Sequence, residues 1–296
     1  SDLAQTLIDS DFAKVQNVER MVIAADQGNY SITLGAAASS AFASTVEITA
    51  AGMQSATLNI DASSALFTDN LNVSGGDAAD RIVGSQIADT ISGGGGADII
   101  EGGKGSDTLS GGAGNDTFVF KVGDTGSTDA TADKILDLAI GDKLDLSAIT
   151  GLQKSQIVFE QQGGYGYIKV PGLGGASQVG WIRVEGVLPG KTAAWTLNNG
   201  ILEVQPNHAP TITVPTTSVV QPLSIFGATV GTSLSNFVIA DADGDTLTVN
   251  LTAASGSFTS PTSVAGITYT AITNGISITG AASNVASAVQ SMQFKG

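Results

Sequence analysis

The sequence predicts an all-β chain in which a parallel β-helix or β-roll, closed by a β-rich cap, precedes a smaller β-sandwich. Three observations support this fold class. A nine-residue motif repeats without a slip over residues 75–119, and short runs of strand-forming residues precede it. Short alternating strands with Thr, Ser and Gly turns follow a Pro-containing linker at 205–210. The 296 residues are enough for two or three domains.

Each of the five copies of the motif carries an aspartate at its sixth position and an apolar residue two positions later. The aspartates are Asp80, Asp89, Asp98, Asp107 and Asp116, and the apolar residues are Ile82, Ile91, Ile100, Leu109 and Phe118. The last three copies match Gly-Gly-x-Gly-x-Asp-x-apolar-x at every fixed position. The first copy has Ala78 in place of its third glycine. The second keeps only Gly84, Asp89 and Ile91, which puts its site in doubt.

The spacing of the motif predicts calcium sites between stacked turns. Each copy divides into a turn of six residues and a strand of three, and glycine permits the positive φ and close backbone approach that the turn needs. Ca²⁺ takes about six to eight oxygen ligands, which two stacked turns can supply and one turn cannot. The candidate ligands are the five aspartates together with Gly93, Gly95, Gly102 and Gly111.

Two copies make one coil, so alternate aspartates should share an edge of the roll. Asp80, Asp98 and Asp116 are expected along one edge, and Asp89 and Asp107 along the other. The alternative is a flexible Gly/Asp-rich linker. That interpretation does not explain five acids in register with five apolar residues, but it describes the metal-free state, in which the carboxylates repel one another.

The motif resembles the nonapeptide repeat of the RTX calcium-binding proteins. The resemblance implies a parallel β-roll that binds several Ca²⁺ ions, in an extracellular protein exported by type I machinery through an uncleaved C-terminal signal. No such signal is recognised in this sequence, and both ends are interpreted as cuts through a longer polypeptide. Residues 1–74 resemble the segments that precede the nonapeptides in bacterial surface-layer and adhesin RTX proteins.

Residues 1–74 are predicted to form an irregular parallel β-helix that continues directly into the roll. A short helix is expected within residues 1–20, where apolar residues lie near helical spacing. Strand-forming runs follow at 18–24, 30–34, 45–49, 56–60 and 71–73. A separate small sandwich is the alternative, and the absence of a linker before Gly75 favours the continuous helix. Asp61 and Asp69 are candidates to close the first calcium turns.

Residues 120–204 are predicted to cap the solenoid, because a terminal coil cannot bury its own apolar face. Strands are expected at 157–161, 165–170 and 181–187. The run from Asp133 to Ser147, Asp-Lys-Ile-Leu-Asp-Leu-Ala-Ile-Gly-Asp-Lys-Leu-Asp-Leu-Ser, resembles the segment after the nonapeptides in serralysin-type C-terminal domains. Asp124, Asp133 and Asp142 are nine apart. They are interpreted either as terminal calcium ligands or as a solvated face or helix caps.

Residues 205–210 are predicted to be a linker, and residues 211–296 an Ig-like or cadherin-like β-sandwich. Strands are expected at 211–214, 236–239, 246–251, 267–270 and 275–278. The Asn-x-Ala-Pro sequence and the run Asp241-Ala-Asp243-Gly-Asp245 resemble cadherin-like modules of large bacterial adhesins. Asp241, Asp243 and Asp245 are candidate ligands of a structural calcium, and a polar β-turn is the alternative.

The composition of the chain indicates which ligands and partners it can bind. The chain has 12 basic and 27 acidic residues, for a formal net charge of −15, and residues 75–145 hold 13 acidic against 5 basic ones. This local acidity favours cations and argues against nucleic acid. There is no cysteine, so calcium is the expected staple. No apolar run approaches the length of a membrane span. Weak modular calcium sites suit millimolar extracellular calcium, so an extracellular or cell-surface location is expected.

Enzymatic activity is not expected. His208 is the single histidine and lies in the linker, so neither a Ser-His-Asp triad nor a two-histidine zinc site can form around it. The His-Glu-x-x-His motif of the serralysin catalytic half is absent, as is a phosphate-binding Gly-x-x-x-x-Gly-Lys-Ser/Thr loop. Trp181 and Trp195 are interpreted as core residues.

Two non-enzymatic functions are predicted. One is a segment of a large secreted RTX adhesin that binds a cell surface or a glycan. The other is a subunit of a crystalline surface layer whose self-assembly depends on calcium. The Ig-like module favours the adhesin and the long N-terminal β-helix favours the surface layer. A module that helps a missing toxin or protease to fold is a third possibility.

Overall fold

The chain divides into two compact units, Ser1–Gly190 with Trp195–Pro206 and Lys191–Ala194 with Asn207–Gly296. The structure, a computed structural model, describes residues 5–24, 28–175, 178–185, 195–205, 211–213, 232–233, 238–240, 246–252, 257–258, 264–273 and 275–295. Among these residues, no helix is both long and apolar enough to cross a bilayer.

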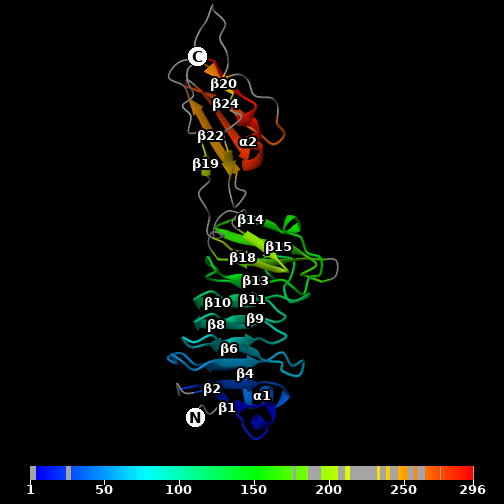
Figure 1. The fold of residues 1–296 in the computed structure, drawn as a ribbon. Helices are drawn as coiled ribbons and strands as arrows, with labels where there is room; N and C mark the ends of the chain where they lie inside the picture. The colour runs from blue at the N-terminus through cyan, green and yellow to red at the C-terminus, as the bar shows by residue number, and fades with distance from the viewer. Residues whose placement is uncertain are drawn as a thin grey trace, which may run out of the picture. The chain divides into compact units, whose positions relative to one another are not determined.

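The first unit is a solenoid built from two nine-stranded sheets (Figure 1). The first sheet contains, in spatial order, β1 (Gln5–Leu7), β3 (Tyr30–Thr33), β5 (Leu58–Asp61), β7 (Arg81–Val83), β9 (Ile99–Glu101), β11 (Thr117–Val119), β13 (Lys143–Asp145), β18 (Ile201–Val204) and β17 (Trp195–Asn198). The second contains β14 (Val158–Gln162), β15 (Tyr165–Pro171), β16 (Val179–Val184), β12 (Asp133–Ile135), β10 (Thr108–Ala113), β8 (Thr90–Gly95), β6 (Asn70–Ser74), β4 (Phe42–Thr49) and β2 (Val18–Val22).

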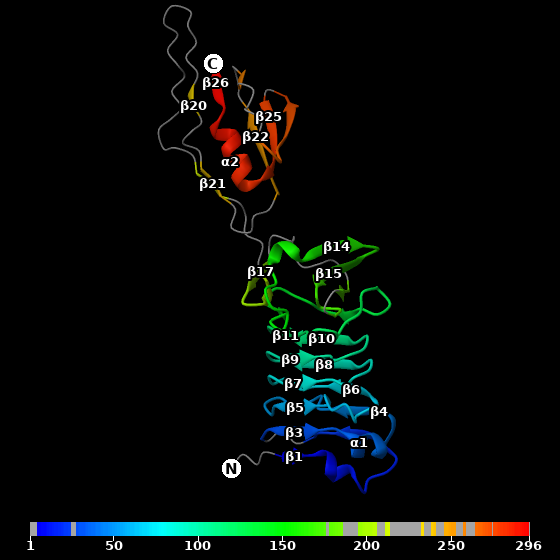
Figure 2. The ribbon, with the colours of Figure 1, turned by 90° about the vertical axis from the view of Figure 1, so that its right-hand side faces the viewer.

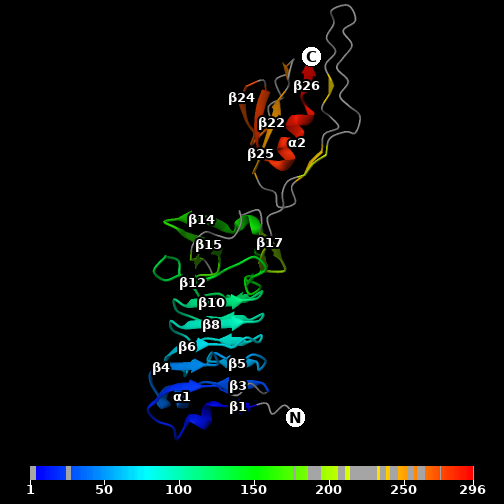
Figure 3. The ribbon, with the colours of Figure 1, turned by 90° about the vertical axis from the view of Figure 1, so that its left-hand side faces the viewer.

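From β1 to β13, odd-numbered strands stack in one column and even-numbered strands in the other, as Figure 2 shows and Figure 3 shows from the opposite side. Neighbours pair in parallel from β1 to β13 and from β2 to β16. In the nonapeptides the register advances by 18 residues per coil, so that Ile82 pairs with Ile100 and Ile100 with Phe118. The apolar residue of each copy therefore points into one continuous core.

The strands of residues 5–74 join the nonapeptides without a break. β5 pairs in parallel with β7, and β6 pairs in parallel with β8. The prediction of a short helix within residues 1–20 is wrong in its detail. That stretch holds β1, a single 3₁₀ turn η1 (Asp9–Phe12) and the start of β2, and Phe12 fills the first coil. The one α-helix described in this unit, α1 (Ala36–Ala41), lies in a run of small residues.

Antiparallel strands cover the far end of the solenoid. β13 pairs with β18, and β16 pairs with β15, which in turn pairs with β14 after the 3₁₀ turn η2 (Lys154–Gln156). Trp195 is fully buried against the ring of Phe159. Trp181 lies instead on the outer face, where Lys169 Nζ sits 3.8 Å from the centre of its ring, so its prediction as a core residue is wrong.

The second unit contains small antiparallel sheets and a helix. Its described strands are β19 (Thr211–Thr213), β20 (Thr232–Ser233), β21 (Val238–Ala240), β22 (Thr246–Thr252), β23 (Ser257–Phe258), β24 (Thr268–Ile272), β25 (Gly275–Ala281) and β26 (Gln293–Lys295). Helix α2 (Ala282–Gln290) follows β25 and was not predicted. Val285, Ala288 and Val289 form its apolar face and pack against Leu247 and Ile278.

Candidate metal centre

The six-residue turns of the nonapeptides stack along two edges of the solenoid. The first edge carries the turns 75–80, 93–98 and 111–116, and the second carries the turns 84–89 and 102–107. Main-chain hydrogen bonds tie neighbours on an edge together, such as Gly95 N–H to the carbonyl of Gly76 at 2.8 Å. The structure thus places the five aspartates on the two edges in the predicted sets.

The aspartates of each edge form a hydrogen-bonded ladder. In the last three copies, the Oδ1 atom of the aspartate accepts the backbone N–H of the aspartate one coil earlier. Asp98 Oδ1 accepts from Asp80 at 2.7 Å and Asp116 Oδ1 accepts from Asp98 at 2.9 Å on the first edge. On the second edge, Asp107 Oδ1 accepts from Asp89 at 2.8 Å. All five side chains are buried, which few unpaired carboxylates are.

The ladders begin on leucine amides. Asp80 Oδ1 accepts from Leu58 N–H and Asp89 Oδ1 accepts from Leu71 N–H, each at 2.7 Å. Asp61 and Asp69 were predicted for this place and lie elsewhere. Asp61 accepts hydrogen bonds from Ser63. Asp69 comes two residues before Leu71, the position that stacks under Asp89, and its Oδ2 is buried without a partner among the described residues. Leu58 and not Asp61 lies under Asp80 because this coil is longer than those of the nonapeptides, with 22 residues from Leu58 to Asp80.

The ladders continue beyond the motif for one more step. Asp133 Oδ1 accepts from Asp107 N–H at 3.0 Å, and Asp142 Oδ1 accepts from Asp116 N–H at 2.9 Å. Asp124 is buried but is not a rung of a ladder, because its carboxylate accepts from Lys121 N–H in its own loop. The offset is 26 residues at both steps, so the nine-residue spacing of the three acids does not govern their placement.

The second carboxylate oxygen separates the aspartates into two kinds. Asp80 Oδ2 accepts from Gly76 N–H at 3.0 Å, and Asp89 Oδ2 accepts from Ser85 N–H at 2.6 Å. Asp98 Oδ2 and Asp107 Oδ2 are buried with no hydrogen-bond partner among the described residues. A buried carboxylate oxygen without a donor is costly, which indicates a cation as the missing partner.

The glycines hold the turns close enough to supply carbonyl oxygens. A Cβ at Gly93 would lie 2.1 Å from Asp98 Oδ2, and one at Gly102 would lie 2.3 Å from Asp107 Oδ2. A Cβ at Gly111 would lie 2.1 Å from the carboxylate of Asp116. These three predicted glycines therefore leave room in front of the carboxylates. Gly95 serves the stacking of turns through its amide.

Two further glycines of the complete copies were not predicted as site residues. Gly94 and Gly96 have φ near +108°, and their carbonyl oxygens face the next turn, within 1.8 Å of a Cβ built at Gly112 or Gly114. Positive φ recurs in the other complete copies at Gly103, Gly105, Gly112 and Gly114. The second and third motif glycines were the sequence signal for these positions; the second copy lacks both and the first copy lacks the third.

Burial, followed by the neighbouring carboxylates, raises the pKa of the ladder aspartates. The pKa of Asp98 and of Asp107 rises to about 7, and that of Asp133, which lies near Asp107 and Asp124, to about 9. The pKa of Asp89 rises to about 6 through burial, which its hydrogen bonds to Ser85 and Leu71 partly offset. The ladder is therefore a line of buried acids that a divalent cation between the turns would stabilise in the charged form.

The donor set fits a hard cation. Among the described residues, no three His, Cys, Asp or Glu side chains gather closely enough to hold a metal by themselves. A cation between the turns 93–98 and 111–116 would combine the carboxylates of Asp98 and Asp116 with main-chain carbonyls such as Gly94 and Gly96. An all-oxygen shell rich in carbonyls suits Ca²⁺ and does not suit zinc or copper.

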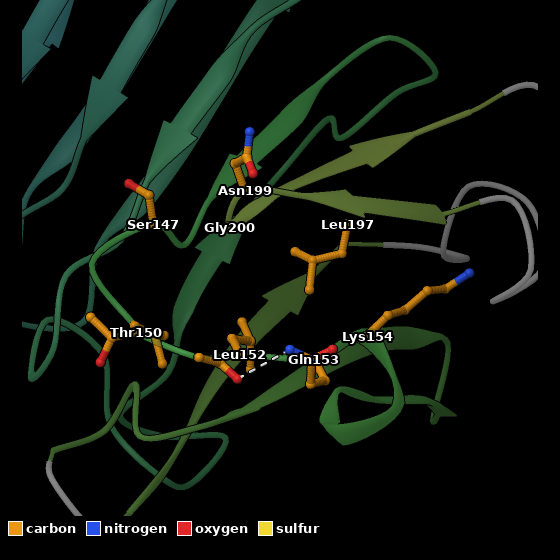
Figure 4. A pocket seen from close by; sticks show the side chains of 10 residues that line it. Ser147, Thr150, Leu152, Gln153, Lys154, Leu197, Asn199 and Gly200 are labelled. Carbon is orange, nitrogen blue, oxygen red and sulfur yellow. Dashed lines mark hydrogen bonds between the residues drawn. The ribbon is translucent and has the colours of Figure 1, made fainter.

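The other predicted site lies beyond the description. Asp241, Asp243 and Asp245 fall outside the described residues. A separate pocket of about 540 Å³ lies in the cap, where Ser147, Thr150, Leu152 and Gln153 face Leu197 and Asn199 (Figure 4). Lys154 is its single charged lining residue, so the pocket is unrelated to the aspartate ladders.

Comparison with protein families matches the nonapeptides. The model for the RTX calcium-binding nonapeptide repeat (4 copies) matches residues 74–109 and 84–118. No curated protein matches the chain. The chain therefore carries RTX calcium-binding repeats, and its strand-rich solenoid with parallel sheets is consistent with an RTX β-roll.

Proposed function

We propose that the chain is an extracellular structural or adhesive segment of a large secreted bacterial RTX protein, an adhesin, in which calcium staples the β-roll. The observation that carries the proposal is the pair of buried carboxylate oxygens, Asp98 Oδ2 and Asp107 Oδ2, which have no partner within the described chain. Each faces glycine turns that leave room for an ion. RTX repeat proteins are typically secreted, which supports the extracellular assignment.

Calcium would act on the fold rather than on a substrate. The ions would neutralise the aspartates of stacked turns and bind coil to coil, so the roll would be rigid only where calcium is abundant. The absence of cysteine supports this role, because disulfides cannot supply the staple. An Ig-like or cadherin-like second unit would then extend the segment, and no enzymatic activity is assigned.

A surface-layer subunit is the second candidate. The observation that favours it is the uninterrupted strand ladder from β1 to β13, because a long regular solenoid presents a repetitive surface for lateral contacts. An adhesin would stay monomeric when calcium fills the sites between the turns, whereas a surface-layer subunit would self-assemble. The two candidates therefore differ in the oligomeric state of the calcium-loaded chain.

A calcium titration followed by circular dichroism and sedimentation tests both proposals. Calcium should increase the β signal and the melting temperature, whereas magnesium at equal ionic strength should have little effect, because Mg²⁺ prefers octahedral sites and keeps its water. A calcium-loaded monomer that binds bacterial or host surfaces would support the adhesin, and ordered sheets would support the surface layer. The same spectrum and melting temperature with and without calcium would refute the staple.

A further inference from the structure

We infer that the calcium-dependent part of the roll begins at Gly93, and that Asp80 and Asp89 cap their own turns with hydrogen bonds instead of binding calcium. The coils of the first two copies are then folded without metal and form a base for the calcium-dependent coils. The inference rests on the proposed calcium function and specifies which aspartates perform it.

The carboxylate contacts carry the first step. Both oxygens of Asp80 are used, Oδ1 by Leu58 N–H and Oδ2 by Gly76 N–H. In Asp98 only Oδ1 is used, by Asp80 N–H, and Oδ2 is left for a ligand. The two side chains have the same place in the motif and are almost equally buried, at 2% and 1% exposed. Asp80 and Asp98 therefore differ in whether Oδ2 has a hydrogen-bond donor, and not in burial.

The second copy repeats this contrast with an added side chain. Asp89 Oδ2 accepts from Ser85 N–H, and Asp89 Oδ1 accepts from Leu71 N–H and from the Ser85 hydroxyl at 2.9 Å. Ser85 is fully buried where the complete copies have their second glycine. Its hydroxyl also accepts from Ile87 N–H at 3.2 Å. A protein hydroxyl thus lies at the centre of the turn, where the complete copies have only backbone.

The backbone of the turns gives independent support. Each complete copy has two glycines with φ between +94° and +139°, which lets two carbonyls turn toward the neighbouring coil. The first two copies have Ala78 and Ile87 at the last of these positions, and neither has positive φ. An L side chain would pay a steric cost there. These two turns therefore cannot present the carbonyls in the same way.

The ladder positions beneath the two caps are occupied by apolar residues and not by carboxylates. Leu58 and Leu71 occupy the ladder positions below Asp80 and Asp89, and both are buried in the core. That core also contains Phe67 and Met53 at 1% exposure, so the coils of residues 42–74 are held by apolar contact. A cation at either ladder position would meet one ladder carboxylate, and both oxygens of that carboxylate already accept hydrogen bonds. Beneath Asp89, the Oδ2 atom of Asp69 is a further buried carboxylate oxygen without a partner among the described residues, but Asp69 is not on the ladder.

Matched Asp→Asn variants of the full chain separate the two roles. In Asp98→Asn and Asp107→Asn the remaining carbonyl oxygen still accepts the ladder amide, so only the charge and the free oxygen are lost. In Asp80→Asn and Asp89→Asn one backbone amide loses its acceptor. The measurements are the number of calcium ions per chain, by equilibrium dialysis with calcium chloride, and the melting temperature in metal-free buffer.

We expect Asp98→Asn and Asp107→Asn each to bind at least one ion fewer than wild type without a lower metal-free melting temperature. Asp80→Asn and Asp89→Asn should bind as many ions as wild type and melt about 5 °C lower, with and without calcium. A lower ion count in either cap variant would overturn the inference. Wild type that binds no calcium at all would instead refute the proposed function.

Hydrogen exchange on wild type keeps the inference testable if a cap variant does not fold. In metal-free buffer at pH 8, peptides from residues 42–92 should stay protected and peptides from residues 93–119 should exchange at least tenfold faster than with calcium. Equal loss of protection in both segments on calcium removal would contradict a metal-independent base. Protection of both segments without calcium would refute the calcium staple itself.

Discussion

The metal-free roll should be stabilised by acid. Burial and the neighbouring carboxylates raise the pKa of Asp98 and of Asp107 to about 7, from 3.8 in the unfolded chain. A raised aspartate pKa means that the folded state binds more protons. The stabilising contribution is therefore complete below about pH 4 and is lost as the pH rises through 7. Neutral carboxyl groups do not repel one another and are cheaper to bury.

The magnitude follows from proton linkage. For a pKa that moves from 3.8 to about 7, raising the pH from 5.5 to 8 removes about 2 kcal/mol of stability per aspartate. Asp98 and Asp107 together then account for about 4 kcal/mol, and Asp133 acts in the same direction. This is a large part of the usual stability of a domain, about 5–15 kcal/mol. Without metal, the coils of residues 93–119 should thus be folded at pH 5.5 and far less stable at pH 8.

Thermal unfolding from pH 5 to 8.5 measures this effect. Calcium should be removed with a chelating resin, because soluble chelators bind it weakly in acid. The double variant Asp98→Asn/Asp107→Asn is the control, and its metal-free melting temperature should vary much less with pH. With saturating calcium the slope should reverse, since protons compete for the carboxylates. Metal-free stability that is constant or rises between pH 5.5 and 8 would refute the reasoning.

Three further outcomes follow from the geometry. Gly112→Ala places a Cβ 1.8 Å from the carbonyl oxygen of Gly94 and should abolish calcium-induced folding. The control is Gly123→Ala, where φ is similar but the space is open, and it should cost about 1–2 kcal/mol of stability. Equal losses of stability for the two variants in denaturant titrations would exclude the close approach to Gly94 as the cause. Phe118→Ala should lower the stability of the calcium-loaded roll by about 3–5 kcal/mol, whereas Ile99→Ala, 42% exposed, should change it little in the same melts. Peptide, ester and glycoside substrates should not be turned over, and reproducible turnover that a point change abolishes would contradict this.

The period of nine was enough to predict the coil and the sets of aspartates on each edge. Two turns and two strands close one coil, so residues 18 apart must stack whatever the identity of the variable positions. The apolar residue two positions after each aspartate then has one place to go, the space between the sheets. In this segment the turn-forming glycines and the spacing of the apolar residues both indicate the same 18-residue coil, so the prediction is strong.

The motif predicted part of the division among the aspartates, because the first two copies lack motif glycines and the site of the second was in doubt. The motif did not show how these turns close, which depends on side-chain contacts such as those of Ser85 with Asp89. The start of each ladder depends on coils of irregular length, because Leu58 and not Asp61 lies under Asp80. Helix α2 had a readable signal in Val285, Ala288, Val289 and Met292, which recur at helical spacing in a run rich in Ala and Ser.

At the end of the roll nearest the cap, both ladders continue for one step beyond the nonapeptide motif, to Asp133 and Asp142. Both ladders lengthen from 18 to 26 residues at their last step, and one insertion of eight residues between β11 and β12 accounts for both, because each step spans that loop. The turn 137–142 therefore stacks in register on the turn 111–116 with Asp137 in the place of the first glycine. Its carboxylate accepts from Gly111 N–H at 3.0 Å and from Gly112 N–H at 2.8 Å.

The ladder of the first edge is thus closed by the protein itself at both ends. Asp142 Oδ2 accepts from Ala139 N–H in its own turn, as Asp80 Oδ2 does from Gly76. Among the ladder aspartates, the buried oxygens that lack partners are on Asp98 and Asp107, in the coils between these turns; Asp69 Oδ2, below the second ladder, lacks one among the described residues as well. Because coils on both sides can form without metal, calcium binding would order only the middle of the solenoid. Loss of calcium should therefore open a central segment between two folded ends, rather than unravel the roll from its cap.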